Sequence, residues 1–325
     1  MKSDAGGEVE KTLAPDDAFA VLGNGTRMEI LQALAETDDP MSFSGLYEQV
    51  DVHDTGQFNY HLDQLTDHFV RRTDRGYELQ RAGERVIEAI VSGAVTEHSV
   101  IEPTPVEWPC YRCGAPTTMS YQQEWVALSC TECPGIYGGE SVEDERAPNE
   151  QLDHGYNGGL SLPSAALEGR TPSEVLRAAW HWDALERLAL ATGTCPRCSA
   201  AVEYSIHICQ DHDAADGPCE ECGTHRMLTK ETTCPNCPFA VRGSLVNAFI
   251  ANTDLIAFLT AHGYNPITPT ADYARMMRDH EEELLSTDPF QAQFTWTIDG
   301  DNISITVDED VNVVAVERER DSGTK

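Results

Sequence analysis

The sequence predicts a multidomain α+β protein. Its 325 residues exceed one typical domain, helical periodicity dominates the N-terminal part, and eleven cysteines follow among segments that alternate like β-strands. The predicted order is a helix-rich domain at 13–95, a linker at 96–109, a cysteine-rich β module at 110–165, a connecting helix at 171–193, a second cysteine-rich β module at 194–243, and helices with a three-stranded antiparallel meander at 244–318.

The helix-rich domain begins with three predicted helices. The first ends at Gly23, Thr26 caps the second, which ends before Pro40, and Ser42 or Ser44 caps the short third helix. These caps place three short helices ahead of the next amphipathic stretch.

A fourth helix follows in "DTGQFNYHLDQL". Its apolar stripe must face a core and consists of Phe58, Leu62, Leu65 and Phe69. The opposite side carries side chains that can contact base edges, with Gln57, Tyr60 and Gln64 pointing outward and Thr55 and Asn59 on the flanks. An Asn or Gln amide can bond adenine in a bidentate manner, which discriminates by roughly 1–3 kcal/mol.

Two short extended runs around Asp74-Arg75-Gly76 predict a β-hairpin after this helix. Arg71, Arg72 and Arg75 cluster there, and arginine suits phosphate or a minor groove. The domain ends in a predicted helix whose apolar stripe is wider than one small domain requires. We therefore expect this helix, within 79–95, to form a homodimer contact through Val86, Ile87, Ile90, Val91 and Val95.

The stretches "LGNGTRMEILQALAE" and "FNYHLDQL", followed by the arginine-bearing hairpin, resemble ArsR-like winged helix-turn-helix regulators of the haloarchaeal type. The resemblance covers about the first quarter of the chain. It implies double-stranded DNA as the partner, with Thr55, Gly56, Asn59 and Tyr60 in groove-facing positions, and related regulators pair through terminal helices. Metal sensors of this group carry cysteines near the recognition helix, whereas the first cysteine here is Cys110.

Combining the helical face with the hairpin, the predicted DNA contacts are Thr55, Gln57, Asn59, Tyr60, Arg71, Arg72 and Arg75. His61 precedes the packed Leu62 and is interpreted as a packing residue. Winged helices also serve as protein-binding modules, and the exposed Asp63 and Asp67 favour that alternative. The second hypothesis is therefore an adaptor to the transcription machinery.

Acidic residues outnumber basic ones by 55 to 22, which gives a formal net charge of −33. The charge is spread along a chain that is 40% hydrophobic, so a disordered acidic tail is disfavoured. Such surfaces resemble those of proteins from extreme halophiles. At molar salt the Debye length is about 3 Å, so the net charge hardly repels DNA at a distance, while the counterion-release gain is also lost. Binding must then rest on short-range contacts.

The sequence has no apolar run of about 18 residues and no signal-peptide pattern at its start, which predicts a cytoplasmic protein. In a reducing cytosol, cysteines favour metal over disulfides. No nucleophile–base pair or phosphate loop is visible, so we expect no enzyme. A weaker third hypothesis is a nucleic-acid-modifying enzyme that uses its cysteine modules to hold substrate.

Two C-x2-C pairs, separated by sixteen residues, predict a first zinc ribbon with Cys110, Cys113, Cys130 and Cys133 as ligands. Gly138–Ser161 is predicted to be an exposed loop. The connecting helix starts with a capping box at Thr171 and Glu174, and its Trp180 and Trp182 are interpreted as core residues.

The remaining cysteines and one histidine predict a second zinc ribbon with two nested sites. The first would use Cys195, Cys198, Cys234 and Cys237, and the second Cys209, His212, Cys219 and Cys222. Spacing also allows Cys195/Cys198 to pair with Cys219/Cys222, although this leaves Cys209 and His212 far from the last pair. Sites closed by four protein ligands indicate up to three structural zinc ions.

After the second module, "SLVNAFIANTDLIAFLTAHGYNP" (244–266) and "TADYARMMRDHEEELLS" are predicted to be helical, with a break in the first near Asn252. The meander follows, and Phe294, Trp296 and Ile298, then Ile303, Ile305 and Val307, mark its buried face around a turn at Asp299-Gly300.

Overall fold

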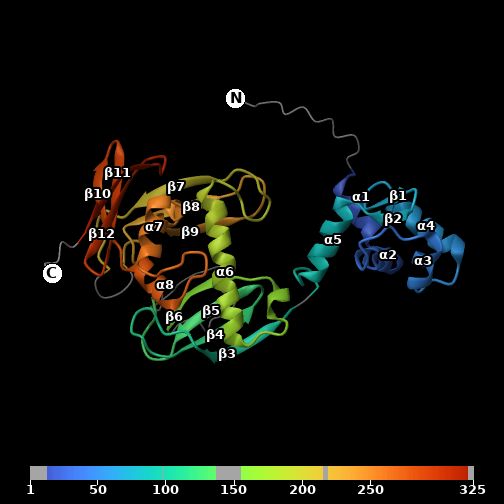
Figure 1. Ribbon diagram of the computed structural model, residues 1–325, viewed down its shortest axis with the longest axis horizontal. Coiled ribbons are helices and arrows are strands. Elements are labelled where there is room, and N and C mark those ends of the chain that lie inside the picture. The colour runs from blue at the N-terminus through green and yellow to red at the C-terminus, as the bar shows by residue number, and fades with distance from the viewer. Residues whose placement is uncertain (1–12, 97, 137–154, 215–218, 321–325) are drawn as a thin grey trace. The chain divides into compact units, whose positions relative to one another are not determined.

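The computed structural model describes residues 13–96, 98–136, 155–214 and 219–320 and has a mixed α+β fold with antiparallel sheets. The chain divides into two compact units, Met1–Glu97 and His98–Lys325, each described by itself (Figure 1). Among these described residues, none of the helices is both long and apolar enough to cross a membrane.

The described residues of the N-terminal unit, 13–96, form five helices and one hairpin. They are α1 (Pro15–Leu22), α2 (Gly25–Ala35), α3 (Phe43–Gln49), α4 (Thr55–Leu65), β1 (Val70–Thr73), β2 (Gly76–Leu79) and α5 (Arg81–Val91). The side chain of Asn24 caps α2, so the prediction of Thr26 as the cap is wrong by two positions. Ser42 caps α3 and Asp54 caps α4, each accepting a backbone N–H three residues later.

The core of this unit forms around the inner face of α4. Phe58, Leu62 and Leu65 are fully buried, and the rings of Phe43 and Tyr47 pack edge-on against Phe58. The apolar stripe predicted from the sequence is therefore confirmed, although its last residue, Phe69, lies beyond the end of the helix.

The first sheet of the C-terminal unit has four strands in the order β3 (Val100–Val106), β4 (Thr117–Gln122), β5 (Trp125–Cys130) and β6 (Tyr156–Ser161). The linker prediction for 96–109 is wrong, because β3 lies in it. Its Pro103 and Pro105 hid the strand, but β3 is an edge strand with a register shift, where proline is tolerated. The loop prediction for Gly138–Ser161 is wrong at β6, and 138–154 lie outside the described residues.

Helix α6 (Pro172–Ala191) covers this sheet, and η1 (Ser164–Leu167) precedes it. Its capping box is present at Thr171 and Glu174, as predicted. Val175, Leu176 and Ala179 are buried against the sheet, and Trp180 stacks on Trp108 with ring centroids 5.5 Å apart. Trp182, in contrast, is 37% exposed, so the core interpretation holds only for Trp180.

The second sheet contains β7 (Glu203–Ile208), β8 (Leu228–Thr233) and β9 (Ala240–Ser244), in that order. It continues into η2 (Leu245–Phe249) and α7 (Thr253–Ala261), which are separated near Asn252 as predicted, and then α8 (Ala271–Arg278). One core joins β8, η2 and α7 to the last sheet.

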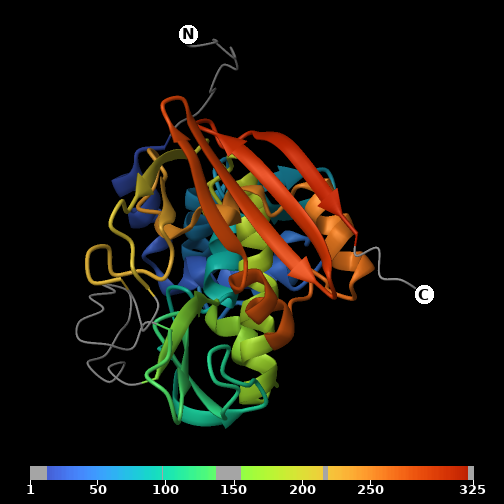
Figure 2. The ribbon, with the colours of Figure 1, turned by 90° about the vertical axis from the view of Figure 1, so that its left-hand side faces the viewer.

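The last sheet has four strands, not the predicted three: β10 (Glu281–Thr287), β11 (Phe290–Ile298), β12 (Asp301–Asp308) and β13 (Val313–Glu319) (Figure 2). The helix predicted through "EEELLS" ends at Arg278, and β10 pairs with β11 instead. The residues of β10 alternate between exposed and half-buried, so sheet pairing overrides their helical propensity. The predicted buried face of β11 and β12 is confirmed.

Candidate functional site

Three groups of four side chains in the C-terminal unit place their sulfur and nitrogen atoms together. They are Cys110, Cys113, Cys130 and Cys133; Cys195, Cys198, Cys234 and Cys237; and Cys209, His212, Cys219 and Cys222. Within each group all ligand atoms lie within 4.8 Å of one another. Every cysteine is a free thiol, and together the groups use all eleven cysteines.

The distances within the groups suit a tetrahedral metal ion. Sulfurs 2.3 Å from a central ion would stand about 3.8 Å apart, and a sulfur and a histidine nitrogen about 3.6 Å apart. The Sγ–Sγ distances are 3.7 Å for Cys110–Cys133 and 3.5 Å for Cys198–Cys234. Nδ1 of His212 lies 3.4 Å from Sγ of Cys222. Disulfide sulfurs would be about 2.05 Å apart, so the spacing is that of groups that could each hold a metal ion.

Each of the three groups contains one C-x2-C pair with the same backbone turn. These turns begin at Cys110, Cys195 and Cys219. The N–H groups of Gly114, Ser199 and Gly223 donate to the carbonyls four residues earlier, at 2.9, 2.9 and 2.8 Å. All three residues have positive φ, at 76°, 61° and 67°. This tight turn directs both thiols of a C-x2-C pair to one point, and Ser199 adopts it without the conformational freedom of glycine.

In the first group, Cys110 and Cys113 precede β4, Cys130 is the last residue of β5 and Cys133 follows it, so the β4–β5 hairpin brings the two turns together. Backbone N–H groups of Cys133 and Glu132 point at Sγ of Cys130, at 3.3 and 3.4 Å. The side-chain amide of Asn157, on β6, donates to Sγ of Cys110 at 3.6 Å. These donors stabilise thiolate charge.

The second and third groups lie at opposite ends of the β7–β8 hairpin. Cys195, Cys198, Cys234 and Cys237 flank its open end, whereas Cys209, His212, Cys219 and Cys222 lie in the connection between the strands. The structure therefore has the nested arrangement and not the alternative pairing, because the strand register holds the two sets apart.

Each group contains at least one thiol whose pKa is lowered by hydrogen bonds and at least one whose pKa is raised. Burial raises the pKa of Cys110, but hydrogen bonds from the backbone N–H groups of Cys113 and Arg112 and from neighbouring thiols outweigh burial. The pKa of Cys110 is lowered to about 7. The amide of Asn236, then a backbone N–H, lowers the pKa of Cys198 to about 6.

Backbone N–H groups lower the pKa of Cys219 to about 6. Burial raises the pKa of Cys133 and of Cys209 to about 12. In the second group, the backbone N–H of Phe239 lowers the pKa of Cys237, but burial and then the neighbouring thiols together outweigh it and raise the pKa to about 12. Each group therefore combines a ready thiolate with a thiol that must lose its proton when a cation binds.

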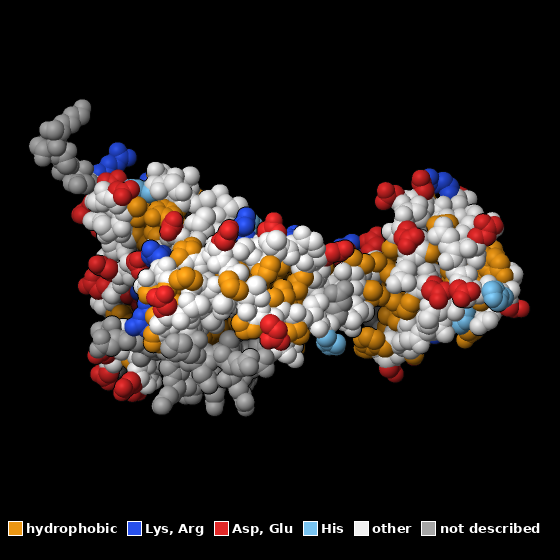
Figure 3. All heavy atoms as spheres, turned by 90° about the horizontal axis from the view of Figure 1, so that it is seen from below, with side chains coloured by type: hydrophobic (Ala, Val, Ile, Leu, Met, Phe, Trp, Pro, Cys, Tyr) orange, Lys and Arg blue, Asp and Glu red, His pale blue; other side chains and the backbone are white. Residues whose placement is uncertain are grey.

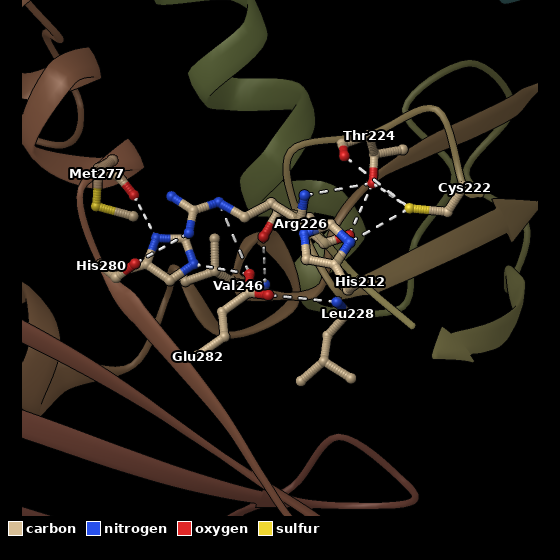
Figure 4. A network of polar contacts seen from close by, with 10 residues as sticks. His212, Cys222, Thr224, Arg226, Leu228, Val246, Met277, His280 and Glu282 are labelled. Atoms are coloured by element: carbon tan, nitrogen blue, oxygen red, sulfur yellow. Dashed lines mark hydrogen bonds and ion pairs between the residues drawn. The ribbon is translucent and has the colours of Figure 1, made fainter. Parts of the chain in front are cut away.

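A polar network extends from the third group to the last sheet (Figure 4). Oγ1 of Thr224 lies 3.4 Å from Sγ of Cys222 and donates to the carbonyl of Arg226 at 2.7 Å. The guanidinium of Arg226 donates to the carbonyl of His280 at 2.9 Å. Glu282, on β10, accepts the backbone N–H of Leu228 at 3.3 Å.

The predicted DNA-contact side chains lie on two surfaces of the N-terminal unit. Thr55, Gln57, Asn59 and Tyr60 are exposed on the outer side of α4, and Tyr60 is 58% exposed. Arg71, Arg72 and Arg75 are exposed on the β1–β2 hairpin. His61 is buried, in agreement with its packing interpretation, and burial followed by Arg27 lowers its pKa.

Three of the predicted DNA-contact side chains already have hydrogen-bond or ion-pair partners within the N-terminal unit. The amide of Asn59 donates to Asp63 at 3.0 Å, and Arg71 pairs with Glu78 on the opposite strand. Arg75 lies 3.5 Å from Asp39, and both side chains are more than 70% exposed. Such exposed pairs contribute about 0–1 kcal/mol each, so a ligand can replace them. The hairpin turn needs Gly76, because φ is 142° and a Cβ there would meet the carbonyl of Met41 at 2.2 Å.

Sequence reasoning missed the residues that support the metal groups, namely Asn157, Asn236, Thr224, Arg226, His280 and Glu282. Asn236 and Thr224 stand two residues from a cysteine, and that proximity is a usable signal. Asn157 and Glu282 come from distant strands, and no local pattern marks them.

Two family models match the chain. One, described as a domain of unknown function (DUF7347), matches residues 15–90, and the other, described as a domain of unknown function (DUF7351), matches residues 107–313. The two matches fall on either side of the division between the units. No curated protein and no solved structure matches the chain.

Proposed function

We propose that this chain, which belongs to the family described as a domain of unknown function (DUF7351), is a sequence-specific DNA-binding transcription regulator. In this proposal the N-terminal unit is a winged helix-turn-helix of the ArsR-like kind. Helix α4 reads base edges in the major groove, and the β1–β2 hairpin is the wing that holds the backbone. The metal groups of the C-terminal unit are zinc ribbons that maintain a surface for a partner or a signal.

The observation that carries the proposal is the exposed outer side of α4 next to an arginine-bearing hairpin. Helices α2, α3 and α4 precede the hairpin in the order that a winged helix requires. Asn59 and Gln57 can form bidentate bonds with adenine, and the 58% exposed ring of Tyr60 can pack on a base or sugar. A helix with one fully buried side and one exposed amide-rich side supports groove binding.

Charge in the hairpin supports the same function. Arg71, Arg72 and Arg75 lie in one short hairpin of a chain with 22 basic residues against 55 acidic ones. Acidic side chains are spread over both units on the face in Figure 3, whereas residues 70–79 carry three arginines against Asp74 and Glu78. On binding, phosphate would replace Glu78 and Asp39 as the partners of Arg71 and Arg75.

Zinc is the metal that we assign to the three groups. Four-thiolate and three-thiolate-plus-imidazole sets with tetrahedral spacing are typical of structural zinc. No water position remains in a site closed by four protein ligands, which supports a structural and not a catalytic role. The ions would contribute folding free energy to hairpins whose own cores are small.

We assign the regulator a homodimeric state through α5. Val91 and Val95 are 70% and 71% exposed, at and beyond the end of this helix, and Phe19 on α1 is 75% exposed. Figure 3 shows hydrophobic side chains gathered on the N-terminal unit. A second copy that covers them would place two α4 helices on a palindromic site.

The test is selection of genomic DNA fragments by the purified full chain in molar KCl. Enrichment of a defined site by the native protein, lost in Asn59→Ala/Tyr60→Ala and kept in Glu88→Ala on α5, would support the regulator. Absence of any enriched site with the native protein would reject it.

The acidic residues on α4 favour a second candidate function, an adaptor that binds transcription proteins. Asp63 and Asp67 are exposed on or just after this helix and would repel phosphates. The double substitution Arg71→Glu/Arg72→Glu separates the two functions. A regulator would lose DNA binding, whereas an adaptor would still assemble with its protein partners.

A further inference from the structure

A cavity of about 330 Å³ lies in the C-terminal unit between the first cysteine turn and the end of α8. Its walls are Tyr111–Gly114 on one side and Arg275, Arg278 and Asp279 on the other. The lining therefore carries three guanidinium groups, including that of Arg112, and one carboxylate. Arginines from segments far apart in the sequence converge there, although acidic residues outnumber basic ones by 55 to 22.

The positive potential extends to a neighbouring histidine. Burial lowers the pKa of His225, the backbone of Ile136 partly opposes this, and the charges of Arg278, Arg112 and Arg226 lower the pKa further. Glu282 lies 3.8 Å from Arg226 and offsets that charge. Arg278 and Arg112 line the cavity, so two of the three arginines that act on His225 belong to its wall.

Arg275 is a charged group whose hydrogen bonds are incomplete. Its Nη2 donates to the carbonyl of Cys110 at 3.4 Å. In the part of the chain that the structure describes, its Nε is buried without a hydrogen-bond partner. A buried charged donor without a partner is unfavourable, and an oxyanion bound at the wall that Arg275 forms would offset the charge of this guanidinium.

The cysteine turn lies against this guanidinium. A Cβ at Gly114 would stand 4.0 Å from Nη2 of Arg275, which is ordinary van der Waals contact, so the φ of 76° and not the guanidinium explains the glycine. Cys113 on the same turn is exposed and also lines the cavity.

We propose that this cavity binds the oxyanion group, phosphate or carboxylate, of a small molecule. Guanidinium groups form paired, charge-assisted hydrogen bonds with such groups, and the volume lies at the lower end of the range for small-molecule sites. The site belongs to the C-terminal unit and is independent of the proposed DNA binding. The alternative is a purely structural role. In that case the arginines would only offset the net negative charge of a four-thiolate metal group.

The test titrates potassium phosphate, and separately potassium succinate, into the full-length metal-bound protein at constant potassium concentration. Tryptophan fluorescence reports binding, because the ring centroids of Tyr111 and Trp180 are 6.1 Å apart, and calorimetry provides a second readout. We expect saturable binding of at least one anion. The preferred anion then distinguishes a phosphate-bearing ligand from a carboxylate-bearing one.

Substitution of the arginines decides whether the cavity is the site. We expect Arg275→Gln and Arg278→Gln each to weaken binding at least tenfold, and Arg242→Gln, an exposed arginine on β9, to leave it unchanged. The metal content of each variant is measured, because Arg275 bonds the carbonyl of Cys110. If Arg275→Gln loses metal, Arg278→Gln decides. Absence of saturable binding of both anions, or native affinity in Arg278→Gln, would overturn the proposal.

Discussion

Nε2 of His280 lies 3.0 Å from Oε1 of Glu282, and both side chains are almost fully buried, at 1% and 6% exposure. Nδ1 of the same ring faces the carbonyl of Met277 at 2.7 Å. Glu282 also lies 3.8 Å from Nε of Arg226 and accepts the N–H of Leu228. One buried carboxylate thus joins the end of α8, the second sheet and β10, and it does so next to the third metal group.

Removal of this carboxylate should destabilise the C-terminal unit. Glu282→Ala removes the buried carboxylate that faces His280 and Arg226, and breaking such a buried charged pair costs about 3–5 kcal/mol. Urea unfolding at fixed KCl, followed by tryptophan fluorescence, measures the loss, since the ring centroid of Trp296 is 5.4 Å from that of His280. Glu283→Ala, an exposed neighbour on β10, should change stability by less than about 0.5 kcal/mol. Equal unfolding curves for the two variants would contradict the role of the network.

Metal stoichiometry should follow the grouping of the cysteines. The native chain should contain three zinc ions, and Cys195→Ala and Cys234→Ala should each lose one because they share a group. The double variant Cys195→Ala/Cys234→Ala should also lose only one, whereas Cys195→Ala/Cys219→Ala should lose two. Elemental analysis of the purified proteins measures this, with Ser205→Ala on β7 as the control. Equal metal loss in the two double variants would contradict the nested arrangement.

The affinity of the three groups for metal should decrease as pH is lowered. The thiols of Cys133, Cys209 and Cys237, with pKa values of about 12, keep their protons at neutral pH without metal. A cation binds thiolates, so each group must release at least one proton. The apparent affinity should therefore fall at least tenfold for each unit by which pH is lowered between about 8 and 6. Competition with a chromophoric chelator at several pH values measures it, and an affinity independent of pH would contradict proton release.

Neutralising the hairpin arginines should remove DNA binding. Arg71→Gln/Arg72→Gln should weaken binding to the selected site at least tenfold, because two phosphate contacts are lost. Arg81→Gln/Arg85→Gln on α5 removes the same charge from the same unit and serves as the matched control. Fluorescence anisotropy with labelled duplex in molar KCl measures both. If the two variants weaken binding equally, the hairpin has no special role.

Charges on the exposed valines of the N-terminal unit should dissociate the proposed dimer. Val91→Glu/Val95→Glu places two carboxylates where a partner's apolar surface would lie, without disturbing the buried Ile87. Sedimentation or light scattering should then show the monomer mass for the variant and twice that mass for the native chain. A native chain that is already monomeric would exclude the dimer.

Local patterns in the sequence predicted much of the fold. The stripe of α4, the capping box of α6 and the alternation of β11 and β12 all depend on periods of a few residues, and the structure confirms each. The predictions failed where local signals opposed the tertiary context. Pro103 and Pro105 suggested a linker in what is an edge strand, and "EEELLS" has the propensity of a helix but pairs with β11.

The sequence by itself determined which cysteines lie in paired turns and which face of each amphipathic helix is buried, because both depend on spacing within a turn or a helical period. Only the tertiary structure decided which pairs share a metal group. It also decided that Asn157 donates to Cys110, that Glu282 meets Arg226, and that Arg275 and Arg278 reach the cavity beside the first cysteine turn. These contacts join segments that are far apart along the chain, and strand register and packing, which leave no periodic signal in the sequence, bring them together.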